Sequence, residues 1–191
     1  MSRPQSSKNK TALVLIDVQN SFFHPDGGNY YPESAAIVPH LKGLLDRARA
    51  AGRPIIHVAE QHRPNVVDFE SAKLPEHCIA GEFDARFFEN FGPKDDSEFL
   101  VAKRRTSAFF STDLDLLLRE KGIERLVIAG VKTNVCVRAT VESGFSLGYH
   151  CIVPREAVSS NRRHLGDASL EDIERYFGWV TTVGEAEEML A

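Results

Sequence analysis

The sequence predicts an α/β fold in which a parallel sheet is covered by helices on both faces. Three observations lead to this prediction. Segments with strand-like and helix-like patterns alternate along the chain, which favours parallel strands joined by helical crossovers. The strand-like runs, such as TALVLIDV at 11–18, are almost continuously apolar, as expected of strands buried on both faces. A length of 191 residues with 42% hydrophobic residues is sufficient for one full core.

Each element of this fold follows from its own pattern of residues. Strands are expected at 11–18, 53–60, 97–103, 125–130, 149–154 and 179–183. Helices are expected at 33–52, 111–122, 134–147 and 169–178, with a Ser or Thr cap on the second, Asn134 and Ser169 as caps of the last two, and Gly52 as the stop of the first. Residues 61–96 are rich in Pro, His and acidic residues and form the longest irregular stretch, which we expect to line a site.

Composition limits the domain organisation and the class of partner. Residues 1–10 are expected to form a flexible tail and residues 11–191 a single domain, with no signal-peptide core and no apolar stretch of membrane-spanning length. The three cysteines are widely spaced and form no CxxC pair, which fits a reducing cytoplasm. A net charge of −4 leaves no basic surface for nucleic acid. The sequence therefore predicts a soluble, cytoplasmic protein that binds neither nucleic acid nor membrane and acts on a small molecule.

Reactive side chains follow three of the expected strands. Asp17 ends the first strand, Lys103 ends the third, and Cys136 follows the fourth in the sequence GVKTNVCVRAT. In open α/β sheets ligands bind at the carboxyl ends of the strands, so these three groups can converge. An acid, a cation and a thiol are the components that nucleophilic catalysis requires. Cys136 is expected in the first turn of a helix, where the backbone N–H groups and the helix dipole favour a thiolate.

Each of these residues also has a structural interpretation. Asp17 alone could cap a turn, Lys103 alone could be a solvated strand end, and Cys136 alone could be a packing residue, because free cysteines are among the most buried residue types. For a single residue the structural interpretation is the commoner one. The presence of all three at strand ends favours a catalytic site.

Three longer segments identify a family. Residues 12–23 (ALVLIDVQNSFF), 101–118 (VAKRRTSAFFSTDLDLLL) and 128–149 (IAGVKTNVCVRATVESGFSLGY) resemble, in order and spacing, the signature segments of the isochorismatase-like cysteine hydrolases. The resemblance covers about residues 11–183. It implies a three-layer α/β/α, Rossmann-like fold with a six-stranded parallel sheet, and a homo-oligomer in which a second chain helps to close the site.

The resemblance also implies roles for individual residues. It implies a catalytic triad of Asp17, Lys103 and Cys136, and a cis peptide bond between Val131 and Lys132 that turns the backbone N–H groups of Lys132 and Cys136 into an oxyanion hole. Isochorismatases that cleave a vinyl ether lack this cysteine. The presence of Cys136 therefore favours hydrolysis of an amide-type C–N bond through a thioester, with release of ammonia.

Short similarities within the family bear on the substrate. RYFGWVTTV at 175–183 resembles the ureidoacrylate-type amidohydrolases, and EQHRP at 60–64 resembles a segment of the biuret-type enzymes. Both favour a small ureido or N-carbamoyl compound. Candidate substrate-binding residues are Phe22, His62, Arg105 and Thr133. Arg105 could clamp a substrate carboxylate with two hydrogen bonds, although a structural salt bridge is the commoner use of such an arginine.

Alternative functions remain open on the sequence alone. No cofactor is expected on the main interpretation, but Glu60, His62 and His77 resemble the metal-binding residues of nicotinamidases, and two His with a carboxylate suit a divalent metal such as zinc or iron. Glu60 stands where that group has Asp, which argues against the metal. A redox-sensing thiol and a non-catalytic binding module are the alternatives that involve no catalysis. A dinucleotide-binding oxidoreductase is disfavoured, because no GxGxxG follows the first strand.

Overall fold

The structure, a computed structural model, describes residues 10–191. The expected tail at 1–10 therefore lies outside the described residues except for Lys10. Within the described part of the chain, no helix is long and apolar enough to cross a membrane.

A parallel sheet forms the centre of the molecule, with strand order β3-β2-β1-β4-β5-β7 and a short strand β6 paired with β4. All recorded strand pairs are parallel. The six expected strands are present. The strand β6 was not expected, because a segment of two residues is too short to show the alternation by which a strand is recognised. The strands are β1 Thr11–Ile16, β2 Ile55–Glu60, β3 Phe99–Lys103, β4 Arg125–Val131, β5 His150–Pro154, β6 Val158–Ser159 and β7 Trp179–Thr181.

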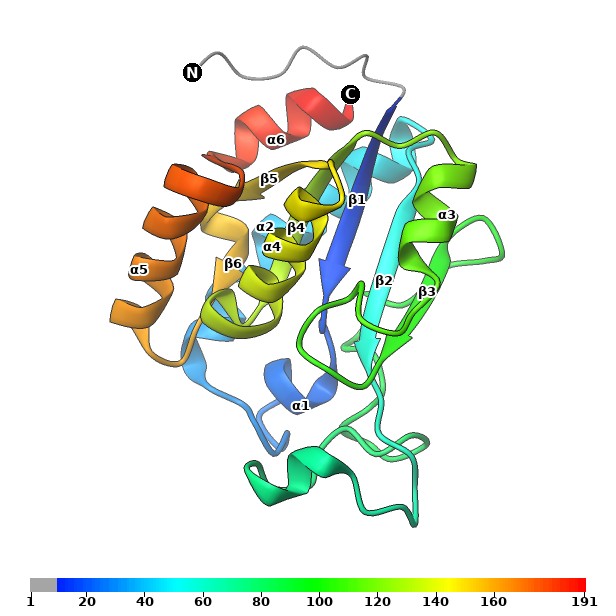
Figure 1. Ribbon diagram of the computed structural model, residues 1–191, viewed down its shortest axis with the longest axis vertical. Coiled ribbons are helices and arrows are strands. Elements are labelled where there is room, and N and C mark those ends of the chain that lie inside the picture. The colour runs from blue at the N-terminus through cyan, green and yellow to red at the C-terminus, as the bar shows by residue number, and fades with distance from the viewer. Residues whose placement is uncertain (1–9) are drawn as a thin grey trace.

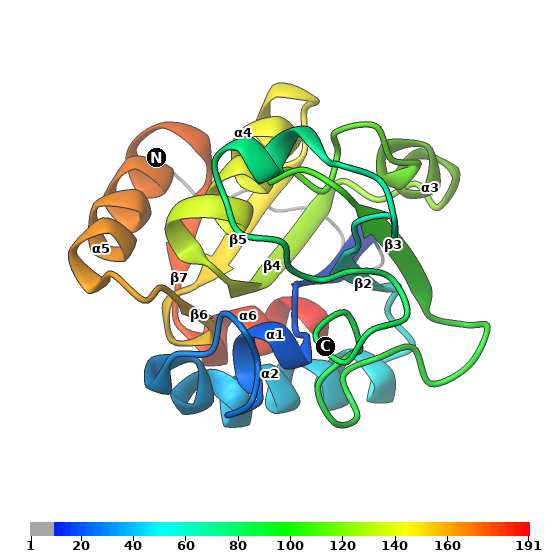
Figure 2. The same cartoon turned by 90° about the horizontal axis from the view of Figure 1, so that it is seen from below.

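Helices cover both faces of the sheet, as the sequence predicts. α2 and α6 lie on one face, and α3, α4 and α5 lie on the other (Figures 1 and 2). The helices are α1 Asn20–Phe23, α2 Pro32–Ala50, α3 Leu114–Glu120, α4 Arg138–Ser146, α5 Arg163–Asp172 and α6 Val183–Leu190. Single turns of other helix types are η2 Phe69–Ala72, η3 Thr133–Val137, η4 Arg155–Ala157 and η5 Ile173–Phe177.

The central strand β1 is buried on both sides because alternate side chains enter two different cores. Leu13 and Leu15 pack into the core beneath α2, with Leu41 and Leu44 among their neighbours. The intervening residues of β1, such as Val14, pack into the core beneath α3 and α4. This explains why β1 reads as an uninterrupted apolar run, and it fixes the register of the strand relative to both layers.

The expected Ser or Thr cap of the helix at 111–122 was wrong, because α3 begins at Leu114 and its N-cap is Asp113.

The starts of two further expected helices were also wrong. α5 begins at Arg163, and the expected cap Ser169 lies inside this helix, where its hydroxyl donates to the carbonyl of Leu165. The expected cap Asn134 lies within η3 and accepts a hydrogen bond from the Ser160 hydroxyl instead. In both cases a polar side chain is satisfied by a partner that a local pattern does not reveal.

Helix α6 was not expected, although the sequence carries a signal for it. Thr182 accepts a hydrogen bond from the backbone of Glu185, and the Glu185 side chain returns to the backbone N–H of Thr182. This reciprocal pair is a capping box, which has the pattern Thr-x-x-Glu. Recognition of TVGE at 182–185 would have predicted the helix.

The long connection between β2 and β3 lies beyond the carboxyl ends of the strands, at the bottom of Figure 1. It contains η2 and is attached to the end of β2 by an isolated bridge between His62 and Ile79. The expectation that residues 61–96 lie at the ligand-binding edge of the sheet agrees with this position.

Candidate active site

Asp17 lies directly after β1, at the centre of the sheet, and its side chain is fully buried. Its backbone has a positive φ of 54°, a left-handed conformation that Asp tolerates better than most residues. Its N–H donates to the carbonyl of Val58 in β2 at 3.0 Å, so the turn remains attached to the sheet. The Asp17 carboxylate is therefore held at the carboxyl edge of the central strand.

Lys103, the last residue of β3, places its buried ammonium group against this carboxylate. Its Nζ lies 2.9 Å from Oδ2 of Asp17 and donates to Sγ of Cys136 at 3.4 Å. A third neighbour is Glu60 at the end of β2, whose Oε1 lies 3.7 Å from Nζ. One ammonium group therefore connects the acid, the thiol and a second carboxylate.

Cys136 lies in η3, the turn that follows β4, and only 6% of its surface is exposed. The peptide bond between Val131 and Lys132, just before this turn, is cis, as the family resemblance implies. One carboxylate oxygen of Asp17 lies within 4.8 Å of Sγ of Cys136. The structure thus brings together three side chains that are distant in the sequence.

Burial determines the protonation states at this site. It raises the pKa of Asp17 to about 6, although the Lys103 ammonium opposes the change. It also raises the pKa of Cys136 well above its ordinary value, again against Lys103. Burial lowers the pKa of Lys103, but the nearby Asp17 carboxylate, Cys136 in its ionised form and Glu60 outweigh it, and the pKa is raised.

Burial opposes the preference for a thiolate that the start of a helix was expected to give Cys136. Desolvation of the buried sulfur outweighs the stabilisation that a helix N-terminus provides. A pKa well above the ordinary value favours the thiol form of Cys136. The neighbouring Asp17 carboxylate, whose pKa is closer to neutrality than that of an ordinary aspartate, is therefore a candidate to accept the proton of this thiol.

A cavity of about 220 Å³ opens onto Cys136. Its lining residues are Phe22, Gly28, Asn29, Glu60, Glu70, Leu74, Pro75, Glu76, His77, Thr106, Lys132, Val135 and Cys136. Of the four expected substrate-binding residues, Phe22 lines this cavity. His62 lines a smaller neighbouring cavity, whereas Thr133 and Arg105 line neither of these two.

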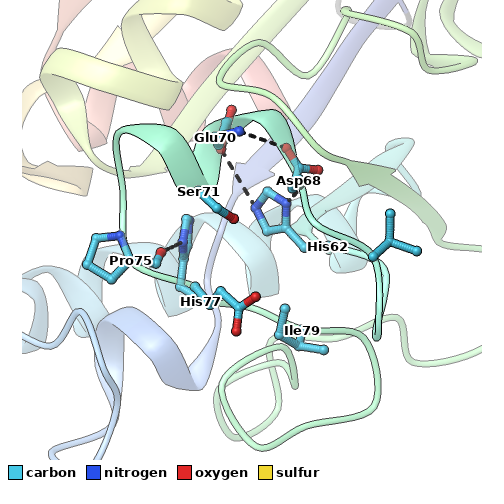
Figure 3. A pocket seen from close by; sticks show the side chains of 9 residues that line it. His62, Asp68, Glu70, Ser71, Pro75, His77 and Ile79 are labelled. Atoms are coloured by element: carbon cyan, nitrogen blue, oxygen red, sulfur yellow. Dashed lines mark hydrogen bonds and ion pairs between the residues drawn. The ribbon is translucent and has the colours of Figure 1, made fainter.

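Two histidines and two glutamates gather near the thiol, and Figure 3 shows three of them, His62, Glu70 and His77. The ligand atoms of Glu60, His62, Glu70 and His77 all lie within 4.8 Å of one another. Nε2 of His62 lies 3.8 Å from a carboxylate oxygen of Glu60 and 3.8 Å from one of Glu70, and Nε2 of His77 lies 3.5 Å from Glu60. The nearby Glu60 carboxylate is the main cause that raises the pKa of each histidine.

Arg105 is attached to this cluster from outside. Its guanidinium lies 2.9 Å from Asp68 and 3.8 Å from Glu70, and Asp68 in turn lies 3.3 Å from Nδ1 of His62. The Arg105 guanidinium thus forms salt bridges with two carboxylates of the protein. This is the structural use of Arg105 that the sequence analysis set against a role in binding a substrate carboxylate. Sequence reasoning missed Asp68 and Glu70, although the acidic DFE at 68–70 was the available signal.

The fold and this site define a class of protein. A parallel sheet sandwiched between helices, with a buried thiol, carboxylate and ammonium group at the carboxyl ends of its strands, is the arrangement expected of a hydrolase that uses a cysteine nucleophile.

The chain belongs to the isochorismatase family, whose domain matches residues 11–185. Ureidoacrylate amidohydrolase RutB of Caulobacter segnis is 31% identical over 92% of this chain and 83% of its own length. Maleamate amidohydrolase of Pseudomonas putida is 31% identical over 95% of this chain and 87% of its own. A crystal structure of a cysteine hydrolase from Pseudomonas syringae superposes with a TM-score of 0.88 at 26% identity, covering 100% of this chain and 98% of the other.

Proposed function

We propose that this protein hydrolyses the C–N bond of a small amide, ureido or N-carbamoyl compound through a thioester on Cys136, with release of ammonia. The family and the relatives that are named amidohydrolases support hydrolysis of a C–N bond. The observation that carries the cysteine mechanism is the position of Lys103 Nζ, 2.9 Å from Asp17 and 3.4 Å from Cys136, beneath a cavity of ligand size.

In the first half of the reaction, the Asp17 carboxylate takes the proton of the Cys136 thiol and the sulfur adds to the carbonyl carbon. The oxygen becomes an oxyanion, which the backbone N–H groups of Lys132 and Cys136 stabilise. One such donor typically contributes about 10²–10³ in rate. Asp17 then donates its proton to the amide nitrogen, the C–N bond breaks, and ammonia leaves the thioester.

In the second half, water replaces ammonia. Asp17 takes a proton from the water, the hydroxide adds to the thioester carbonyl, and the C–S bond breaks as the acid is released. The sulfur recovers its proton from Asp17, so the site returns to its starting state. Lys103 remains charged throughout, because its raised pKa keeps the ammonium form, and it holds the carboxylate and the sulfur in contact.

Ammonia release tests the proposal. We expect turnover of at least one compound from a panel of ureido, N-carbamoyl and primary amides by the wild-type protein, and loss of at least about 10³-fold in Cys136→Ala. Cys151→Ala is the matched control, because Cys151 is a buried thiol within β5 that does not line the cavity. Turnover that survives in Cys136→Ala would show that no thioester forms. Reaction with peroxide in the absence of any turnover would favour a redox sensor.

A metal-assisted amidase is the second candidate, because the cluster Glu60, His62, Glu70 and His77 fits a divalent ion. The buried Nε2 of His62 has no hydrogen-bond partner among the described residues. The other ring nitrogens are held as those of metal-bound histidines usually are, Nδ1 of His62 by Asp68 and Nδ1 of His77 by the Pro75 carbonyl. Glu60 reaches both rings although it stands in place of Asp, which removes the objection drawn from its length.

These four side chains would hold zinc or iron, and the ion would supply a Lewis acid beside the scissile carbonyl. Metal analysis of the purified protein, dialysis against chelator and readdition of zinc or iron test this candidate. We expect His62→Ala to lower the metal content on this reading. A protein that is fully active without metal would exclude it and leave the thiol mechanism unaffected.

A further inference from the structure

A positively charged side chain on the cavity wall has no use in the mechanism described above. Lys132 is half-buried and lines the cavity beside Cys136. Its Nζ lies over the rings of Phe22 and Tyr31, 5.6 Å and 6.0 Å from their centroids. Contacts of this length with aromatic faces hold the ammonium group in position. No carboxylate among the described residues lies within ion-pair distance of it, so its counter-ion is missing.

The opposite wall of the cavity has the other sign of charge. Glu60, Glu70, Glu76 and His77 come from the end of β2 and the segment that follows it, whereas Lys132 follows β4. β1 lies between β2 and β4 in the sheet, so the two walls begin two strand spacings apart, about 10 Å. The cavity is therefore lined by charged groups that come from two different parts of the sheet edge, and Phe22, Leu74 and Val135 add apolar surface to its lining.

We propose that Lys132 is a specificity-determining residue that pairs with a carboxylate at the far end of the substrate. The preferred substrates are then short amides or ureido compounds in which two or three bonds separate the scissile carbonyl from a carboxylate. Their NH₂ group faces the carboxylates on the β2 side, which accept hydrogen bonds, and their anionic end faces Lys132. The inference rests on the proposed function and specifies its substrate class.

Two other cationic side chains of the described residues lie near the site, and neither is available for this role. Arg105 is engaged by Asp68 and Glu70 and does not line the cavity. Lys103 lies beneath the cavity in contact with Asp17 and Cys136. Burial lowers the pKa of Lys132, which shows that its charge is poorly solvated. A bound carboxylate would replace the lost hydration with a charge-assisted hydrogen bond.

A pair of substrates of nearly equal length tests the role of Lys132. Succinamate carries a carboxylate beyond its amide, and pentanamide ends in a methyl group. We expect Lys132→Met to lower the ratio of their kcat/KM values by about 10–100-fold, mainly through the KM of succinamate, because each tenfold corresponds to about 1.4 kcal/mol of lost pairing. Lys132→Arg should keep the ratio within about threefold. The ratio cancels any general damage to catalysis, which matters because Lys132 also contributes a backbone N–H.

Binding measured by calorimetry in a Cys136→Ala background separates this inference from the proposed reaction. The Cys136→Ala protein with Lys132 intact should bind succinamate at least about tenfold more tightly than pentanamide. Addition of Lys132→Met should abolish this difference in affinity. Equal affinity for the two compounds, or a preference that survives Lys132→Met, would overturn the assignment. If the wild-type protein hydrolyses neither compound but the preference in binding is present, the reaction proposal fails for this substrate class and the anion site stands.

Discussion

Strand β2 carries two buried ionisable side chains, His57 and Glu60, whose surroundings differ in one important respect. The His57 ring is completely satisfied: Nδ1 lies 2.6 Å from the Phe91 carbonyl and Nε2 lies 2.8 Å from Glu98. Glu98 also accepts from Arg49 at 2.7 Å. His57 is thus a core histidine whose two ring nitrogens both have partners.

The end of β2 that carries Glu60 is not satisfied in the same way. Contacts of Glu60 with Lys103, His62 and His77 lie between 3.5 and 3.8 Å, which is long for hydrogen bonds. Nε2 of His62 and Oδ1 of Asp17 are buried without a hydrogen-bond partner in the described part of the chain. A buried polar network that is complete contributes stability, whereas an incomplete one has groups left over for a ligand. On the same strand, the complete network around His57 therefore stabilises the fold, whereas the incomplete network around Glu60 has polar groups available for a ligand.

The largest effect is expected at Asp17, where a substitution tests whether the incomplete network serves activity rather than stability. Asp17→Asn keeps the size of the side chain but removes the base, so we expect kcat to fall by about 10²–10⁴-fold. The melting temperature should fall less than in a variant of a satisfied buried pair, because burial already disfavours the charged form of Asp17 and Glu60 remains 3.7 Å from the Lys103 ammonium group. Steady-state ammonia release and thermal melting measure the two quantities. A large loss of stability with kcat retained would show that Asp17 is structural.

The reverse pattern is expected at Glu98. Glu98→Ala leaves Arg49 and His57 without their buried partner, so the free energy of unfolding should fall by about 3–5 kcal/mol. The kcat of the folded protein should remain within about twofold of wild type, since Glu98 does not line the catalytic cavity. Urea unfolding and activity at low temperature test this. Loss of kcat without loss of stability would contradict the structural role of the His57 cluster.

The two clusters should also respond differently to acid. The pKa of Asp17 is raised to about 6, so the base becomes protonated and kcat/KM should fall tenfold per unit as pH decreases below about 6. The pKa of Glu98 is lowered to about 2 from its ordinary value of 4.5, chiefly by the hydrogen bond from Arg49. Its contribution to stability is therefore present above pH 4.5 and is lost as pH falls toward 2. Activity should disappear at a higher pH than folded structure does, and coincident acid limbs of both quantities would contradict this order.

The smallest effect is expected at Arg105, which supports the incomplete cluster from outside. Its side chain is partly exposed, so Arg105→Met should cost only about 0–1 kcal/mol of stability. Because Asp68 and Glu70 lose a partner, we expect the KM to rise a few-fold with little change in kcat. Arg104→Met is the control at a neighbouring position that lines neither of the two cavities next to the thiol. A large loss of kcat in Arg105→Met would indicate that Arg105 contacts the substrate directly.

The sequence predicted the strands and the residues at their ends well, because continuous apolar runs depend on burial between two layers. Asp17 and Lys103 were found at the ends of two such runs, and Cys136 in the turn that follows a third. Asp68 and Glu70 were not, because the path of residues 61–96 depends on tertiary contacts. The hydrogen bonds of His62 with Cys78 and Ala80, which fold this segment back onto itself, leave no periodic signal.

The influence of burial on the pKa of Cys136 was not visible in the sequence for a related physical reason. Position at the start of a helix is visible in the sequence, but the degree of burial of the Cys136 sulfur depends on the whole site. In the same way, the use of Arg105 in a salt bridge depends on a segment whose conformation could not be predicted. The sequence analysis assigned a role only to the backbone N–H of Lys132. A role for its side chain could be proposed only from its position in the cavity lining.

The order of strands in the sheet has a consequence for when the protein can first act during its synthesis. β1 pairs with both β2 and β4, so the strand that delivers Asp17 acquires its second neighbour only after the chain has been made as far as β4. Until then the base has no thiol to deprotonate, and a cysteine outside the assembled site keeps its ordinary reactivity. Recovery of ammonia release on refolding should therefore report closure of the central sheet and lag behind the recovery of helical signal.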